Sequence, residues 1–178
     1  CSSKLRDNLS SNIIGITGSC GKTSLKELLG KTLLKFSRVT YSKKSHNNKF
    51  GVPLSLFNLK QNDDYGIFEI GMDKKGEIDY LSNIIKPDVG VITNISYAHA
   101  KNFNDIKQIA LAKAEIIKNI KKNGILILNS DDSFFNLHKK IAYKNNLKVF
   151  SFGIKNKNSN IRLNKIVKEK NKFKLIIK

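Results

Sequence analysis

The sequence lacks tryptophan and has only two prolines, two cysteines and three arginines among its 178 residues. Cys1 and Cys20 cannot build a disulfide framework, and neither has a second cysteine or a histidine at metal-site spacing, so both are expected to be reduced thiols. No apolar run approaches the roughly 18 residues that a membrane helix needs, and the first residues lack the apolar stretch of a signal peptide. We therefore expect a soluble, cytoplasmic protein with no membrane partner.

Acidic residues are also scarce, since 14 Asp and Glu stand against 33 Lys and Arg, a formal charge of +19. Such a charge ordinarily suggests nucleic-acid binding, because clustered cations neutralise phosphates. Here the cations are scattered along the chain and are nearly all lysines, whereas specific recognition favours the planar fork of arginine. No nucleic-acid partner is expected; a basic nucleic-acid-binding domain is a rival whose affinity would fall steeply with salt.

The chain is long enough, and with 40% hydrophobic residues apolar enough, to bury the core of one compact domain. Short apolar runs alternate with helical patterns, which predicts an α/β fold with a mostly parallel sheet and helices on both faces. The expected strands are 12–17, 38–41, 65–70, 88–94, 124–129 and 147–152, and the expected helices are 23–36, 53–59, 76–85, 104–120 and 131–144.

The two ends of the chain have a different character. Residues 1–11 are interpreted as a polar lead-in or linker, and residues 12–178 as the domain. After Gly153 a polar stretch precedes two alternating runs, 161–167 and 173–177, which predict an antiparallel hairpin at the domain edge. Because the chain stops on a strand with nothing to close the fold, we expect it to be part of something longer.

Residues 17–23, Thr-Gly-Ser-Cys-Gly-Lys-Thr, lie between the first strand and a helix that carries Leu25, Leu28, Leu29, Leu33 and Phe36 at helical spacing. In this setting backbone N–H groups and the helix dipole can cradle a polyphosphate. Lys22 would reach the β- and γ-phosphates, and the Thr23 hydroxyl would hold Mg2+. A strict phosphate loop would need glycine where Ile16 stands, so this is a variant. A connecting turn is the alternative, but a P-loop three-layer sandwich is favoured. The predicted nucleotide-binding residues are Gly18, Ser19, Cys20, Gly21, Lys22, Thr23 and Ser24.

Two further candidates stand where strands are expected to end. Glu69 closes the apolar run Tyr-Gly-Ile-Phe-Glu, and the carboxyl ends of strands are where open α/β sheets bind ligands. We predict that Glu69 reaches a phosphate-bound Mg2+ rather than being an exposed strand-end carboxylate. His99 follows the next expected strand, 88–94, where a neutral imidazole could ligate a second divalent cation. A loop histidine is more often a surface residue, and the residues alone leave both readings open.

Lys113 falls inside the apolar stripe of the helix expected at 104–120, four residues after Ile109 and four before Ile117. A lysine on an inward face is costly unless it is paired, neutralised or able to snorkel outward. Carbamylation by CO2 would convert its amine into an anion that can ligate Mg2+, and a lysine with a depressed pKa is the kind that reacts. The residues alone leave snorkelling and carbamylation open.

The order of these motifs resembles that of the Mur ligases, over residues 12 to the end. The motifs are Thr17 to Thr23, Asn47-Asn48, Gly51-Val-Pro53, Glu69-Ile-Gly71, Thr93-Asn94, His99, Lys113 and Asn129-Ser-Asp-Asp132. The stretches 69–78 and 87–94 are most similar to the family type that adds D-alanyl-D-alanine. Types that add other amino acids, and the related folylpolyglutamate synthetases, differ there.

The resemblance implies an ATP-dependent ligase of peptidoglycan precursor synthesis. Its substrates would be UDP-N-acetylmuramoyl-tripeptide and D-alanyl-D-alanine, joined through an acyl phosphate with release of ADP and phosphate. It implies catalytic roles for Lys22, Glu69, His99 and Lys113, and metal ligation by Thr23, Glu69, His99 and carbamylated Lys113. Asn129 and Asp131 resemble positions near the adenine and ribose, and Asn47 and Asn48 resemble part of the muropeptide-facing loop.

The sequence departs from the family pattern at Ser45, where an Asn is usual, and at Lys49, where an uncharged or acidic residue is common. It also lacks the family's N-terminal UDP-sugar-binding domain and its C-terminal domain, so this chain alone is expected to be inactive. Two rivals are another amide ligase of the superfamily, such as one adding meso-diaminopimelate or glutamate, and a non-catalytic nucleotide-binding module that controls a partner.

Overall fold

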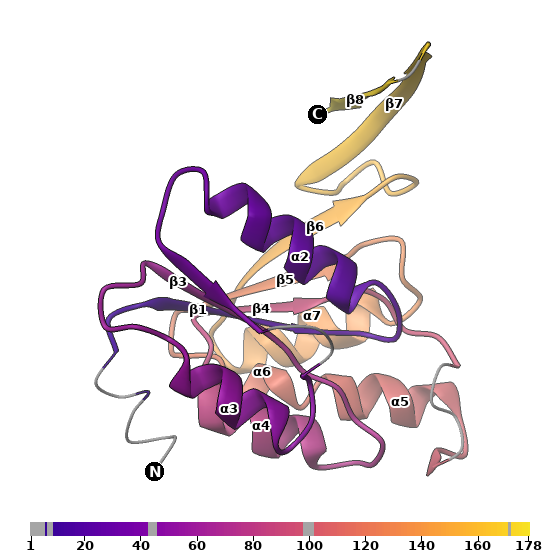
Figure 1. The fold of residues 1–178 in the computed structure, drawn as a ribbon. Coiled ribbons are helices and arrows are strands. Elements are labelled where there is room, and N and C mark those ends of the chain that lie inside the picture. Colours follow the sequence, from indigo (N-terminus) through magenta and orange to yellow (C-terminus); the bar gives the residue numbers. More distant parts are fainter. Residues whose placement is uncertain (1–5, 7–8, 43–45, 98–101, 171) are drawn as a thin grey trace.

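A computed structural model describes residues 6, 9–42, 46–97, 102–170 and 172–178. Its centre is an eight-stranded sheet of order β2-β3-β1-β4-β5-β6-β7-β8 (Figure 1). The strands are β1 (Asn12–Thr17), β2 (Val39–Tyr41), β3 (Tyr65–Glu69), β4 (Val89–Ile92), β5 (Ile125–Asn129), β6 (Lys148–Gly153), β7 (Ile161–Glu169) and β8 (Lys172–Ile177). Neighbours from β2 to β7 are parallel, whereas β7 and β8 are antiparallel. The predicted fold class and the edge hairpin are confirmed.

Helices cover both faces of this sheet. They are α2 (Lys22–Leu33), α3 (Gly51–Phe57), α4 (Glu77–Ile85), α5 (Ile106–Lys113), α6 (Ile116–Asn119) and α7 (Phe135–Lys144). In Figure 1, α2 lies on one face and α3 to α7 lie on the other. None of the helices in the described ranges is long and apolar enough to cross a membrane.

Successive strand residues point to opposite faces of the sheet, so the core has two parts, and these parts differ in size. Ile13 of β1 belongs to the large cluster that contains side chains of α3 to α7. Ile16 belongs to a smaller cluster, in which Leu25 and Leu29 of α2 pack against Ile67. The sheet is therefore anchored mainly by its many-helix face, and the second face depends on α2 alone.

The rotation of α2 differs from the one that its leucines predict. Leu28 is 65% exposed and Phe36 is 81% exposed, whereas Lys26 and Gly30 are buried. A side chain at Gly30 would come within 2.6 Å of the ring of Tyr41 on β2, so the helix needs glycine there to lie this close. Residues 26 and 30 are four apart and so lie on one face of the helix, the face turned to the sheet.

The single helix expected at 104–120 is wrong, because the structure has two helices, α5 and α6. The backbone tightens between them: the N–H of Glu115 donates to the carbonyl of Ala112, and the N–H of Ile117 donates to that of Ala114. These are three-residue rather than four-residue spacings, which overwind the chain. The carboxylate of Glu115 is then free to accept hydrogen bonds from the start of α4.

The described part of the lead-in packs against the domain. The guanidinium of Arg6, 1% exposed, donates to the carbonyl of Ile85 and forms a 2.8 Å ion pair with Asp88. Leu9 is buried, and the hydroxyl of Ser11 donates to the carbonyl of Asp63. These contacts tie the lead-in to the edge of the sheet opposite the carboxyl ends of the strands.

The burial of two isoleucines predicts that an Ile→Ala substitution lowers the free energy of unfolding by very different amounts at the two positions. Ile116 is 0% exposed in the core, whereas Ile166 on the edge hairpin is 56% exposed. Ile116→Ala should lower the free energy of unfolding by about 2–5 kcal/mol, because it removes buried methyl groups and leaves a cavity. Ile166→Ala, the matched control, should cost under about 0.5 kcal/mol. Urea denaturation measures both, and equal losses would contradict this description of the core.

Candidate functional site

The candidate site lies where the order of strands reverses. β1 stands between β3 and β4, so the carboxyl ends of these three parallel strands meet at one edge of the sheet. In open α/β sheets this edge is where ligands bind. The turn from β1 to α2 runs along this edge, and it contains the predicted nucleotide-binding residues from Gly18 to Ser24.

The glycines of this turn have separate structural tasks. Gly18 has a φ of 137°, and a side chain there would collide with the hydroxyl of Thr93. Gly21 has a φ of 81° and is the N-cap of α2, with open space around it. Glycine adopts these angles without steric cost. The turn is thus packed tightly against the end of β4 at one point and is open to a ligand at the other.

Hydrogen bonds hold this turn to the segment that follows β4. The N–H of Ser19 donates to the Asn94 carbonyl at 2.9 Å, and the N–H of Cys20 donates to Asn94 Oδ1 at 3.0 Å. The hydroxyl of Thr93 donates to the Cys20 carbonyl at 2.7 Å. Sequence reasoning quoted Thr93 and Asn94 as a family motif but gave them no task. Their position as polar residues directly after an apolar strand was the available signal.

Lys22 and the start of α2 together provide an anion-binding surface. The ammonium of Lys22 donates to the carbonyls of Gly18 at 2.8 Å and Ser19 at 3.2 Å, so it folds back over the turn. The first turn of α2 contains no acidic residue. Its unpaired N–H groups and the positive end of the helix dipole therefore remain available to a phosphate.

The carboxylate of Glu69 meets the start of α2 from the end of β3. Glu69 is 1% exposed; its Oε2 accepts a 2.8 Å hydrogen bond from the Thr23 hydroxyl, and its Oε1 accepts one of 2.8 Å from Asn47 Nδ2. A hydroxyl and a carboxylate are hard oxygen ligands of the kind that Mg2+ accepts. The structure brings together the two residues predicted to share the first metal, and that role stays a prediction.

Lys113 does not snorkel to solvent. It is 2% exposed, and its Nζ donates a 3.0 Å hydrogen bond to the carbonyl of Gly18, beneath the turn. Burial first, and then the nearby positive charge of Lys22, lower the pKa of Lys113 from 10.5 to about 7, against a smaller opposing effect of Cys20. A large share of Lys113 is therefore the neutral amine near pH 7.

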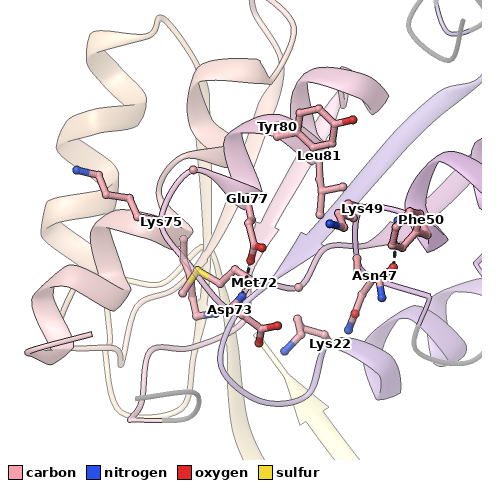
Figure 2. Close-up of a pocket in the computed structure, with 14 residues that line it drawn as sticks. Lys22, Asn47, Lys49, Phe50, Met72, Asp73, Lys75, Glu77, Tyr80 and Leu81 are labelled. Atoms are coloured by element: carbon pink, nitrogen blue, oxygen red, sulfur yellow. Dashed lines mark hydrogen bonds between the residues drawn. The ribbon is translucent and has the colours of Figure 1, made fainter. Parts of the chain in front are cut away.

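A cavity of about 680 Å³ adjoins the phosphate-loop residues (Figure 2). Its lining includes Lys22 and Lys113 from the phosphate side, together with Asn47, Asn48 and Lys49 from the segment before α3. Its other walls are residues at the start of α4 and just before it: Gly71, Met72, Asp73, Lys75, Gly76, Glu77, Tyr80 and Leu81. A molecule in this cavity would lie directly beside a phosphate held by the turn.

Glu115 fixes the wall of the cavity, and sequence reasoning did not single it out. Its carboxylate accepts the N–H of Gly76 at 2.9 Å and that of Asp79 at 3.1 Å, which caps the start of α4 from a separate helix. Asn48 performs a similar task at the start of α3, since its side-chain oxygen accepts the N–H groups of Phe50 and Gly51. Asn47, by contrast, reaches Glu69.

Asn129 is the last residue of β5, two strands away from β1, and Asp131 follows it; neither lines the cavity. The Asp131 carboxylate accepts N–H groups of Ile154, Lys155 and Asn156, and these hydrogen bonds lower the pKa of Asp131. Asn129 Oδ1 accepts the N–H of Asp131. Their contacts stabilise the connection after β6, and their predicted roles near adenine and ribose stay predictions.

His99 and Ser45 lie outside the described residues. Within the part of the chain that the structure describes, no group of three or more His, Cys, Asp or Glu side chains is arranged to hold a metal ion.

The strand order, together with a glycine-rich turn between β1 and α2, defines an α/β domain of the phosphate-loop class. Residues 16–178 match the family model described as the Mur ligase middle domain. The chain belongs to the Mur ligase family, as its motifs predicted.

Curated and solved relatives carry more specific names. The chain is 40% identical over 147 residues to the UDP-N-acetylmuramoyl-tripeptide--D-alanyl-D-alanine ligase of Buchnera aphidicola, covering 83% of this chain and 32% of that protein. Crystal structure I of MurF from Acinetobacter baumannii superposes with a TM-score of 0.90 at 29% identity, covering 99% of this chain and 38% of the other. MurF ligase from Thermotoga maritima, in complex with ADP, gives 0.85 at 26% identity, covering 99% and 40%. The chain spans about a third of the length of the curated relatives it matches.

The lowered pKa of Lys113 predicts a pH dependence of stability. Between pH 7 and 10.5 the unfolded chain holds a proton on this lysine that the folded chain releases, so stability should rise with pH in this window. The rise is up to about 1.4 kcal/mol per pH unit. Lys113→Met should remove it, as urea unfolding at pH 7, 8 and 9 in CO2-free buffer would show. Parallel curves for both proteins would contradict the prediction.

Proposed function

We propose that this chain is the ATP-binding middle domain of a cytoplasmic ligase that joins D-alanyl-D-alanine to UDP-N-acetylmuramoyl-tripeptide. The observation that carries the proposal is that Lys22 of the phosphate loop and Lys113 of α5, which both donate to the loop carbonyl of Gly18, also line the cavity. A γ-phosphate on the loop would therefore lie beside an acid held in the cavity. The names of the relatives, and the ADP in the Thermotoga structure, support this assignment.

The reaction has two displacements. An oxygen of the tripeptide's terminal carboxylate attacks the γ-phosphorus of ATP, the bond to ADP breaks, and an acyl phosphate forms. The amine of D-alanyl-D-alanine then attacks the acyl carbon, phosphate leaves with the bonding pair, and the amine gives up a proton. The contribution of this chain is to orient the phosphates on the α2 N–H groups and to neutralise their charge with Lys22.

Thr23 and Glu69 are the residues that would hold Mg2+, since their oxygens already lie 2.8 Å apart at the start of α2. When bound there, the ion supplies positive charge against the phosphate oxygens. The second-metal set in this proposal is His99 with carbamylated Lys113. Lys113 is suited to carbamylation because its neutral amine, when it attacks CO2, gives a carbamate with loss of one proton, and its pKa of about 7 keeps that amine populated.

The flanking parts of the enzyme are also proposed, because the chain covers only 32% of its Buchnera relative. An N-terminal UDP-sugar-binding domain and a C-terminal domain would complete the substrate sites, and this chain alone should be inactive. An amide ligase with another amine acceptor, or a non-catalytic nucleotide-binding module, would differ in which acceptor, if any, stimulates ATP turnover.

Phosphate release tests the proposal in the polypeptide that carries this chain. With UDP-linked tripeptide present, release from ATP should require D-alanyl-D-alanine and should fall by about 10²-fold or more in Lys22→Ala, because a charge beside the transferred phosphate is lost. Lys31→Ala, which removes an exposed lysine from the same helix, serves as the control and should be unaffected. Dependence on another amine would reassign the type, and turnover without muropeptide would overturn the ligase proposal.

Chemical rescue tests the carbamate. Lys113→Ala should lose most activity, and short carboxylic acids such as acetate or propionate should restore part of it by supplying the missing anionic oxygens in the space left by the side chain. Lys22→Ala should not be rescued, since that position requires a cation. If carboxylic acids fail to rescue Lys113→Ala and a cationic additive restores its activity fully, Lys113 acts as an amine and not as a carbamate.

A further inference from the structure

Lys26 places a second buried cation at the phosphate loop, on the face of α2 that is turned to the sheet. Its side chain is 0% exposed, and its Nζ lies 3.9 Å from Glu69 Oε2 and 3.5 Å from Glu27 Oε1. Glu27 is 35% exposed and so is screened by water, whereas Glu69 is 2% exposed. Of these two carboxylates, Glu69 is the one that shares the buried environment of Lys26.

The same carboxylate oxygen serves two residues of α2. Glu69 Oε2 accepts the hydroxyl of Thr23, and Lys26 approaches it from one turn further along the helix. A carboxylate this close to the phosphate loop would repel a polyphosphate strongly, since charges interact over longer distances where water is excluded. An ammonium 3.9 Å from Glu69 Oε2 would offset that repulsion whether or not a metal ion is present.

We propose that Lys26 is a positioning residue: it holds the Glu69 carboxylate in place, and it offsets the repulsion between Glu69 and the phosphates before a divalent cation arrives. The inference rests on the proposed ATP binding. It predicts that part of the affinity for ATP survives without Mg2+. It also predicts that Lys26 contributes this metal-independent part. Bound Mg2+ can replace the positive charge of Lys26, but in the absence of Mg2+ that replacement is lost.

The test measures the dissociation constant of ATP in Mg2+ and in EDTA, in the polypeptide that carries this chain. Lys26→Met keeps the length of the side chain but removes the charge, and the ratio of the EDTA constant to the Mg2+ constant should rise by at least about tenfold. Lys31→Met removes the same charge from an exposed position on the same helix, and its ratio should equal that of the unsubstituted protein. In the double variant Lys26→Met/Glu69→Gln the EDTA constant should return toward that of the unsubstituted protein, because the uncompensated carboxylate is gone. The EDTA constant is the readout for this variant because Glu69 is itself proposed to hold Mg2+.

Each outcome decides the inference. A ratio for Lys26→Met equal to that for Lys31→Met overturns it, and so does an EDTA constant that stays raised in the double variant. If Lys26→Met does not fold, recovery of folding and of metal-free ATP binding in the double variant supports the role, since breaking a buried pair costs more than removing both members; a double variant that stays unfolded overturns it. Absence of ATP binding by the unsubstituted protein overturns the proposed function itself, whereas binding with an unchanged ratio overturns only the role of Lys26.

Discussion

The close packing of Gly18 on Thr93 is the constraint on which the site depends. No side chain fits between the turn after β1 and the end of β4, and the N–H groups of Ser19 and Cys20 are bonded to Asn94. On its other side the turn is held by β3, through the bond from Thr23 to Glu69. Because β1 lies between these two strands, the strand order places the phosphate loop between the polar residues Thr93 and Asn94 after β4 and the carboxylate of Glu69 at the end of β3.

That attachment also sets the rotation of α2. Once the Thr23 hydroxyl is bonded to Glu69, the helix must turn residues 26 and 30 toward the sheet. Gly30 then leaves room for Tyr41, and Lys26 becomes a buried charge. The leucines at 25 and 29 pack at the flank, while Leu28 is left in solvent. The hydrogen bond from Thr23 to Glu69 at the first turn of the helix thus outweighs the hydrophobic pattern in setting its rotation.

The sequence predicted the strands well because each is a short apolar run between polar or glycine-containing segments, and β1 and β5 begin and end within a residue of expectation. It did not predict the burial of Lys26, since side-chain hydrophobicity favours Leu28 at the inward position. It also missed the break between α5 and α6, because Ala114 and Glu115 are good helix formers. The break depends on a tertiary contact, the bonds from Gly76 and Asp79 to Glu115, that no local pattern records.

The segment that contains this break connects the two halves of the site. Lys113 reaches the carbonyl of Gly18 beneath the phosphate loop, and Glu115, two residues later, reaches the start of α4 at the cavity wall. Residues two apart on a helical chain point in nearly opposite directions, so one short stretch of backbone spans the distance between loop and wall. The width of the cavity beside the phosphate loop is therefore set by the junction of α5 and α6 rather than by a surface loop. A ligand that displaces Lys113 from Gly18 would act directly on the element that also holds α4.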